Sequence, residues 1–437
     1  MIPSHSEKVW AMVQAAVGQG SEERREEKTL PSAVLVGGTN SAFPLPLNGC
    51  IERAEGTRVW DESGKEYTDF LLASGPMILG HSHPAVVQAV AEQLPKGSAY
   101  YSINRPAVDL AEEIVSIPGC VDIARFASTG TEATMHALRL ARAYTRRERV
   151  LVFAGGYHGS HDVSIVGHRG ALKAQAGGVP SHVVDDVFVG KFNDIESVRR
   201  IFADHGQKIG AVLVEPQQRS LDPVPGFLEE LRDICRAHGT VLIFDEVLTG
   251  FRLAYGGAQE YYGVEPDLIC YGKIIGGGFP IAAVAGRREI MALADPGRSE
   301  SNDYVHFSGT LSGNPISAVA GVATLRELRA PGSYERLHYL GERLRGRLQQ
   351  AVDAEGVAAD VIGSGPIAAV NFADAGEPGS GKLLKSEVNR EMIQRGILVQ
   401  LQTRMYVSLA HTEDEIDRAG WVFGEALAAA RKSPTLV

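Results

Sequence analysis

Short apolar runs alternate with amphipathic stretches from about residue 80 to residue 330. Residues 150–154 and 241–244 are apolar runs with the length of buried strands, whereas residues 227–238 place their apolar side chains on one helical face before Gly239, a common helix end. Strands and helices that alternate in this way are typical of a parallel sheet covered by helices. We therefore expect an α/β fold, with further strands at residues 123–127, 211–214, 268–271 and 282–285.

The two ends of the chain show a different pattern. Residues 58–72 alternate loosely around a turn at residues 62–65, which predicts a hairpin. A helix beginning at Pro315 is broken at Pro331-Gly332. After this break, helical patterns interleave with strands, at residues 334–355, 368–372, 385–395 and 406–409.

These patterns divide the chain into three parts. We expect residues 76–330 to form a large domain and residues 331–437 to form a smaller α+β domain. Residues 1–75 are expected to be an N-terminal segment that contributes to the smaller domain.

The amino-acid composition excludes several kinds of partner and location for this protein. The chain has 437 residues, with 43 Lys and Arg against 53 Asp and Glu, and none of the basic clusters that nucleic acids need. No apolar run reaches the roughly 20 residues of a membrane-spanning helix. The cysteines form no C-x-x-C pair, which argues against a disulfide framework or a zinc site: Cys50, Cys120, Cys235 and Cys270. We expect a cytoplasmic protein that binds neither nucleic acid nor membrane and holds no metal.

The first segment that carries candidate chemistry is Ser128-Thr129-Gly130-Thr131-Glu132, where the strand at residues 123–127 gives way to a helix. Hydroxyls and a glycine leave backbone N–H groups available at the positive end of the helix, a common binding place for phosphate. The same residues also fit an ordinary helix N-cap with Glu132 in the first turn. The segment alone does not decide between these interpretations.

The second segment is the acid pair Asp245 and Glu246, which ends the apolar strand at residues 241–244. Ligand-binding groups of α/β sheets gather at the C-terminal ends of strands, and a carboxylate buried there needs a partner to stay charged. A metal ion and a protonated ring nitrogen are both suitable partners. The pair alone does not separate them.

Lys273 follows the strand at residues 268–271 and precedes three glycines at positions 276–278. Burial lowers the pKa of an amine and favours its nucleophilic form, which a Schiff-base lysine requires. The alternative is the lysine of a phosphate-binding P-loop, but here the lysine precedes the glycines and is followed by Ile274. The pattern favours the nucleophile.

Two further turns supply an aromatic platform and more hydroxyls. Tyr157 follows a strand and can stack on a flat cofactor, although a packed core tyrosine is the alternative. His158 and His161 are spaced i, i+3 but lack a nearby carboxylate of the metal-binding type. Thr310 lies in a hydroxyl and glycine turn before a helix. Together, these segments meet the needs of a phosphorylated aromatic aldehyde with a ring nitrogen, namely pyridoxal 5′-phosphate.

Over nearly its whole length, the sequence resembles the class III, fold-type I pyridoxal-phosphate aminotransferases. Within them it resembles the branch that contains glutamate-1-semialdehyde aminomutase, D-phenylglycine aminotransferase and β-amino-acid aminotransferases. The fold implied has a seven-stranded, mostly parallel sheet in the large domain. The matching segments are Gly-Thr-Glu-Ala-Thr at 130–134, Tyr-His-Gly at 157–159, Val-Glu-Pro at 214–216, Phe-Asp-Glu-Val-Leu-Thr-Gly-Phe-Arg at 244–252, Gly-Lys-Ile-Ile-Gly-Gly-Gly at 272–278 and Gly-Thr-Leu-Ser-Gly-Asn-Pro at 309–315.

The resemblance also implies roles for single residues. Lys273 is implied to form the internal aldimine, which is a Schiff base with the cofactor, and to move the proton, while Asp245 keeps the ring nitrogen protonated. Thr310 is implied to reach the phosphate bound by the neighbouring subunit, so a homodimer is expected. The other residues implied to bind the cofactor are Thr129, Gly130, Thr131, Tyr157, His158, Glu215, Gln218 or Ser220, and Val247.

The chain departs from these relatives where substrate is expected to bind. The turn at residues 37–41 aligns with one that a carboxylate-binding arginine closely follows in the relatives, but residues 42–45 are Ala-Phe-Pro-Leu. Thr403 aligns with a glutamate characteristic of the aminomutase. Arg404 can replace the missing arginine as a carboxylate clamp, or it is a surface arginine at a strand edge. Ser41 is the second candidate for substrate binding.

The sequence therefore favours a transaminase, which moves an amino group from an amine or amino acid to a keto acid, ketone or aldehyde. The alternative is a glutamate-1-semialdehyde-type 2,1-aminomutase, which moves the amino group within one molecule. A catalytically silent binding protein is disfavoured because Lys273 and Asp245 are intact.

Overall fold

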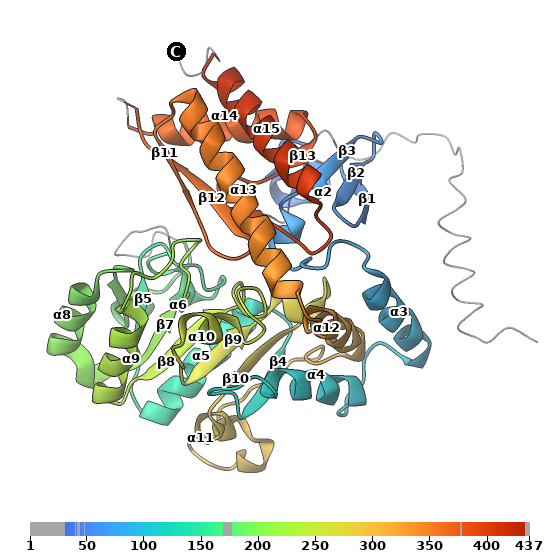
Figure 1. Cartoon of the computed structure of the whole chain (residues 1–437). Coiled ribbons are helices and arrows are strands. Elements are labelled where there is room, and N and C mark those ends of the chain that lie inside the picture. The colour runs from blue at the N-terminus through green and yellow to red at the C-terminus, as the bar shows by residue number, and fades with distance from the viewer. Residues whose placement is uncertain are drawn as a thin grey trace, which may run out of the picture.

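The computed structural model of the chain describes residues 31–39, 41, 44–47, 49–168, 177–375 and 378–432. The elements form a large part, drawn below in Figure 1, and a smaller part above it. Residues 40, 42 and 43, next to the predicted substrate-binding Ser41, lie outside the described residues.

A seven-stranded sheet forms the centre of the large part, in the order β4-β10-β9-β8-β7-β5-β6. The strands from β9 to β6 are parallel, and β10 runs antiparallel to both of its neighbours. The predicted α/β fold with a mostly parallel sheet is thus confirmed. The strands are β4 (Ile123–Ala127), β5 (Arg149–Phe153), β6 (Val187–Gly190), β7 (Ile209–Val214), β8 (Val241–Glu246), β9 (Leu268–Tyr271) and β10 (Ala282–Gly286).

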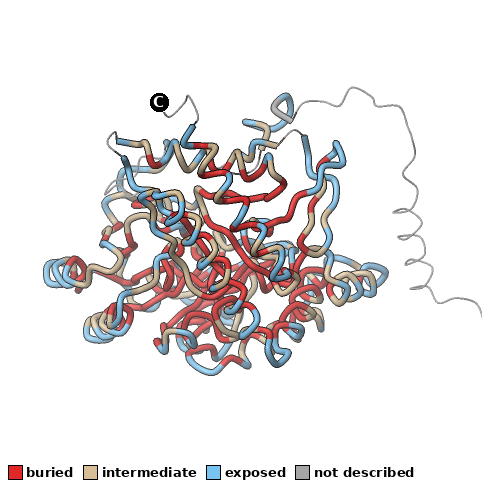
Figure 2. The backbone as a smooth tube through the Cα atoms, turned by 45° about the horizontal axis from the view of Figure 1, so that its top comes forward, coloured by how far each residue is buried: buried red, intermediate tan, exposed pale blue. Residues whose placement is uncertain are grey.

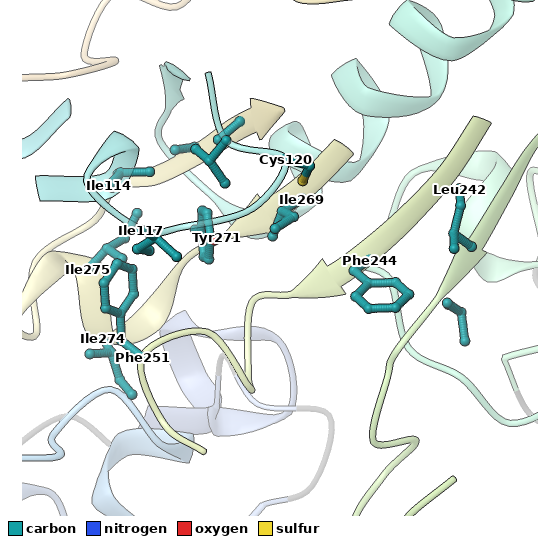
Figure 3. Packing of buried hydrophobic residues seen from close by; sticks show 14 of the residues in the cluster. Ile114, Ile117, Cys120, Leu242, Phe244, Phe251, Ile269, Tyr271, Ile274 and Ile275 are labelled. Atoms are coloured by element: carbon teal, nitrogen blue, oxygen red, sulfur yellow. The ribbon is translucent and has the colours of Figure 1, made fainter. Parts of the chain in front are cut away.

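Helices bury both faces of this sheet. Leu242 and Phe244 of β8, both labelled in Figure 3, pack in one apolar cluster with residues of α4, α9 and α12. Val241 and Ile243 pack in another cluster with residues of α5. Successive side chains of a strand point to opposite faces, so burial of both faces explains why the strands are continuous apolar runs. The helices of the large part are α3 (Pro84–Gln93), α4 (Arg105–Val115), α5 (Gly130–Thr145), α6 (Asp162–Ile165), α7 (Ser181–Asp185), α8 (Ile195–His205), α9 (Phe227–His238), α10 (Gly257–Tyr262), α11 (Arg288–Met291) and α12 (Pro315–Leu328).

The smaller part combines the two ends of the chain. Strand β13 (Ile397–Leu398) pairs in parallel with β3 (Glu66–Asp69), the second strand of the predicted hairpin, and so joins C-terminal to N-terminal residues. This confirms that both ends contribute to the smaller α+β part, while the boundaries at residues 75 and 330 stay a prediction. The other elements are α2 (Pro31–Val34), β1 (Ile51–Glu55), β2 (Arg58–Asp61), α13 (Ser333–Glu355), β11 (Ala359–Ile362), β12 (Ile367–Phe372), α14 (Ser380–Gln394), β14 (Met405–Tyr406) and α15 (Glu413–Ala430).

Two C-terminal elements differ from their predicted ranges. Strand β14 ends at Tyr406 instead of residue 409, because the N–H of Val407 donates to the carbonyl of Pro366 and that of Leu409 to the carbonyl of Ile78. Helix α14 begins at Ser380 instead of near residue 385, directly after Gly379 in the left-handed conformation. Across the described ranges, no helix is both long and apolar enough to cross a membrane.

Arg252 joins the large part to the smaller part. Its side chain is fully buried, its Nε donates to the carbonyl of Leu248 at 2.8 Å, and its Nη2 donates to the carbonyl of Gly75. The guanidinium also lies 5.1 Å from the centre of the Tyr406 ring. Burial lowers the pKa of Arg252 to about 10, which leaves it charged at neutral pH. Figure 2 shows buried backbone through the middle of the molecule, with exposed residues toward its edges.

A short 3-10 helix, η5 (Lys273–Gly276), follows β9 and packs against α12. The packing is so close that a Cβ atom built on Gly321 of α12 would lie 2.1 Å from the carbonyl oxygen of Ile275. The remaining 3-10 helices are η1 (Val36–Gly38), η2 (Leu72–Ser74), η3 (Leu94–Lys96), η4 (Gly206–Lys208), η6 (Ala292–Ala294) and η7 (Pro296–Arg298).

We expect Gly321→Ala to lower the free energy of unfolding by about 1–3 kcal/mol, the usual cost of overpacking, because the added methyl meets backbone that cannot move aside. Gly346→Ala is the matched control, since it adds the same methyl to helix α13 where nothing lies within 4 Å of it. The free energy of unfolding of Gly346→Ala should rise by about 0.5–1 kcal/mol, because alanine loses less backbone freedom on folding than glycine does. Urea unfolding measures the free energy of unfolding of both variants. Equal values for Gly321→Ala and Gly346→Ala would contradict the close packing at Gly321.

Candidate active site

A cavity of about 500 Å³ opens where the large part meets the smaller part. Its walls include residues that follow four of the central strands, β4, β5, β7 and β9, and residues at the end of β8. Ligand sites of parallel sheets occur at this edge. The smaller part contributes Thr403, Arg404 and Tyr406 to the same cavity.

The N-terminus of α5 forms one end of the cavity. Thr129 caps this helix, because its Oγ1 accepts a hydrogen bond from the N–H of Glu132 at 3.2 Å. The N-cap interpretation is therefore correct, and it is compatible with anion binding because the residues around this cap, Ser128 to Thr131, line the cavity.

Glycines bring this helix end close to two neighbouring loops. A Cβ atom on Gly130 would lie 3.0 Å from both methyl groups of Val247, and one on Gly159 would lie 2.5 Å from Oγ1 of Thr131. The chain therefore approaches this end of the cavity more closely than larger residues would allow.

Asp245 is buried at the end of β8 and is held in place by two hydrogen bonds. Its Oδ2 lies 2.8 Å from Nδ1 of His158, and its Oδ1 accepts from the N–H of Val247 at 3.1 Å. The other ring nitrogen of His158, Nε2, is buried without a hydrogen-bond partner in the part of the chain that the structure describes. Among the described residues, the His158 ring therefore forms a hydrogen bond only with the carboxylate of Asp245.

Glu246 points away from the cavity and does not form a site with Asp245. Its carboxylate accepts hydrogen bonds from the N–H groups of Ala258 and Gln259 and from the hydroxyl of Thr249. Burial raises the pKa of Glu246 to about 7. Adjacent residues of a strand face opposite sides, so the metal-binding interpretation of the acid pair is wrong. Within the described ranges, no three His, Cys, Asp or Glu side chains are grouped as a metal site.

Lys273 enters the cavity from the turn after β9, with a backbone φ of 46°. Burial lowers the pKa of its amine to about 8, and the charges of Arg404 and Arg252 act in the same direction. Asp245 and Glu215 oppose the shift because they favour the ammonium form. At pH 7 about a tenth of the amine is therefore neutral, and so nucleophilic, compared with well under a thousandth for a lysine of ordinary pKa.

Tyr157 and Glu215 contact each other in the cavity wall. The carboxylate of Glu215 accepts a hydrogen bond from the N–H of Tyr157 at 3.0 Å. The ring of Tyr157 is 45% exposed, which leaves it accessible from the cavity, and it packs against His168 edge to face.

Four of the residues named for the site from the sequence lie outside the lining of this cavity. Gln218 donates from Nε2 to the carbonyl of Ala154 at 2.8 Å, and Ser220, its alternative, is fully buried. Ser41 is exposed, and its N–H donates to Oγ1 of Thr39. Thr310 lines a different cavity of about 1170 Å³, which is compatible with a contact to another subunit.

Two arginines line the cavity, and the sequence pointed to only one of them. Arg404 is 3% exposed, so its alternative interpretation as a surface residue is wrong. Its Nε and Nη1 atoms are buried without a hydrogen-bond partner among the described residues. Arg219, the residue after Gln218, was missed because its direction depends on a turn that the sequence pattern does not indicate.

Comparisons with known proteins agree with this geometry. A family model described as aminotransferase class-III matches residues 42–427. The chain belongs to the class III aminotransferase family.

The relatives of this class III aminotransferase carry names of two kinds. A glutamate-1-semialdehyde 2,1-aminomutase from Desulforamulus reducens is 41% identical over 435 residues, which cover 95% of this chain and 99% of that protein. An omega-transaminase from Sphaerobacter thermophilus has a similar structure, with a TM-score of 0.86, 32% identity and 98% of each chain covered. A transaminase with PLP bound has a TM-score of 0.84 at 31% identity, with 98% of this chain and 99% of that chain covered.

The cofactor of this class III aminotransferase is pyridoxal 5′-phosphate, and the residues of the cavity fit it. The glycine-lined end at α5 suits the phosphate, the buried carboxylate of Asp245 suits a protonated ring nitrogen, and the amine of Lys273 suits the aldehyde. These three groups line one cavity, as a single bound molecule requires.

We expect the apoenzyme to capture pyridoxal 5′-phosphate covalently at a rate that rises with pH around a pKa of about 8, because only the neutral amine of Lys273 attacks an aldehyde. Absorbance at each pH after mixing measures the rate, and Lys273→Ala provides the background from other lysines. A rise centred near the ordinary lysine value of 10.5 would show that burial does not shift this amine.

Proposed function

We propose that the protein is a transaminase that moves an amino group from an amine or amino acid donor to a keto acid, ketone or aldehyde acceptor. The observation that carries the proposal is that Lys273, with its lowered pKa, shares a cavity with the buried guanidinium of Arg404, which has no partner among the described residues. The first is a nucleophilic amine, and the second is a group that recognises carboxylates.

In this proposal, Lys273 holds the cofactor and carries the proton, and Asp245 faces the ring nitrogen. Thr129, Gly130 and Thr131 bind the phosphate, while Tyr157 and Val247 cover the two faces of the ring. His158 and Glu215 support this arrangement through their hydrogen bonds to Asp245 and to the N–H of Tyr157. Bound pyridoxal 5′-phosphate supplies the electron sink and the carrier for the amino group.

Arg404 is proposed to bind a carboxylate of the substrate. A guanidinium removed from water without a partner is unfavourable, and a carboxylate bound in two parallel hydrogen bonds removes that cost. Because Arg404 comes from the smaller part and Lys273 from the large part, the substrate would lie between them. Ser41 remains a candidate for the other side of the substrate.

A homodimer located in the cytoplasm completes the proposal. Support for the dimer comes from Thr310, which lines a cavity apart from Lys273 of its own chain and is therefore available to a second subunit. By the family resemblance, such a threonine is expected to reach the phosphate bound by the neighbouring subunit.

The second candidate is a glutamate-1-semialdehyde-type 2,1-aminomutase, because the 41% identical relative carries that name. Thr403 lines the cavity at the position where the aminomutase is expected to have a glutamate, which favours the transaminase. The two functions differ in one measurable property: a transaminase half-reaction leaves the cofactor in its amine form, whereas a mutase returns it unchanged.

We expect one class of donor to convert the purified enzyme to the amine form of the cofactor without any acceptor. Absorbance spectra recorded after adding single amines and amino acids test this. The variant Lys273→Ala should keep the fold, judged by circular dichroism, and lose turnover. Normal turnover in that variant would refute the assignment of Lys273, and an enzyme that no donor converts would favour the mutase.

We expect Arg404→Gln to raise KM for carboxylate substrates by about ten- to a hundredfold, the range for a lost hydrogen-bonded charge, with less effect on amines that lack a carboxylate. Arg326→Gln serves as the control, because Arg326 is an exposed arginine that does not line the cavity. An equal rise in KM for both substrate classes would indicate structural damage instead of a lost clamp.

A further inference from the structure

Arg219 places a second guanidinium in the wall that also contains Arg404. It comes from the loop after β7 in the large part, whereas Arg404 comes from the segment before β14 in the smaller part. The Arg219 guanidinium lies 5.9 Å from the centre of the Tyr157 ring and forms no hydrogen bond or ion pair with any residue that the structure describes. Two arginines therefore enter one cavity from different parts of the molecule, and neither has an acidic partner among the described residues.

The backbone at Arg219 is unusual and directs this side chain. The N–H of Leu221 donates to the carbonyl of Gln218 at 2.8 Å, and the two residues between them have positive φ, 57° at Arg219 and 98° at Ser220. A tight turn with two positive φ angles strongly prefers Asn and Gly, and other residues there are strained. The side chain of Ser220 is buried, while that of Arg219 lines the cavity.

Neither of the two acids that line the cavity, Asp245 and Glu215, forms an ion pair with these arginines in the described structure. Asp245 is bonded to His158 and to the N–H of Val247. Glu215 accepts from the N–H of Tyr157, and it is not within ion-pair distance of either arginine in the described structure. Burial lowers the pKa of Arg219, and the charge of Arg404 acts in the same direction, whereas the charge of Glu215 opposes the shift. An anion between or beside the two arginines reduces the repulsion between their charges.

We infer that Arg219 and Arg404 each bind one carboxylate and that the enzyme prefers dicarboxylic amino or oxo acids to monocarboxylic ones. Two guanidiniums together offer about ten N–H donors, whereas one carboxylate offers about four acceptor positions, so a second carboxylate is needed to pair both arginines. This inference deepens the proposed function and rests on it, because it assigns the substrate class to the same cavity.

Binding of unreactive acids to the holoenzyme tests the inference without turnover. Glutarate is compared with butyrate, a monocarboxylate of similar size, by titration calorimetry at fixed salt. We expect glutarate to bind the natural enzyme at least about tenfold more tightly. Equal affinities would overturn the inference.

The decisive variant is Arg219→Gly, because glycine accepts the positive φ and removes the guanidinium without adding strain. It should weaken glutarate binding about tenfold or more and leave butyrate binding nearly unchanged, and Arg219→Lys should retain part of the preference. Arg146→Gly is the matched control, since Arg146 also has positive φ, at 54°, but is exposed and does not line the cavity. An equal loss for both acids in Arg219→Gly would show that the arginines share one carboxylate, which also overturns the inference.

Failure of this inference is distinguishable from failure of the proposed function. If monocarboxylic donors convert the cofactor but glutarate shows no preference, the transaminase assignment stands and the dicarboxylate site is wrong. If no donor converts the cofactor but the glutarate preference is present and disappears in Arg219→Gly, the site is confirmed and the transaminase assignment fails.

Discussion

Burial of the central sheet on both faces is the constraint from which the cavity follows. Helices cover β8 and β9 from two sides, so a charged group in the middle of either strand would lose water without gaining a partner. Polar groups therefore occur where the strands end. Asp245 and Lys273 enter the cavity there, while Glu246, on the opposite side of β8, is bound by N–H groups at the start of α10. The same burial lowers the pKa of Lys273, so the stability of the fold and the reactivity of its amine have a common source.

The cavity has two sides of different origin. The side formed by α5, Asp245 and Lys273 belongs wholly to the large part, and its residue types are those that the family cofactor needs. The other side combines Arg219 of the large part with Thr403 and Arg404 of the smaller part. This division agrees with relatives named both as an aminomutase and as transaminases, because proteins of both names can share the first side and differ in the second.

The sequence predicted those features that depend on burial and local chain direction. Strand β9 was placed at its observed residues, and Lys273 and Asp245 were placed at strand ends, because continuous apolar runs of this length have few other structures. Strand β6 was not predicted, since its four residues form an edge strand that is only partly buried. Arg219 was missed for another reason: its direction is set by two positive φ angles, and the sequence Arg-Ser does not indicate them. The sequence does not decide whether Arg404 is a carboxylate clamp or a surface arginine, because its burial depends on how the smaller part packs.

The contacts of Arg252 limit how far the large part and the smaller part can move relative to each other. Nη2 of Arg252 donates to the carbonyl of Gly75 and its guanidinium lies against the ring of Tyr406, so separating the two parts at this point would cost a buried charge both of these contacts. A hydrogen bond to a charged group is worth about 1.5–3 kcal/mol, which makes this junction a poor hinge. Relative movement of the two parts at this junction is therefore unfavourable, which favours a constant distance between the reactive amine of Lys273 and the cavity wall formed by the smaller part.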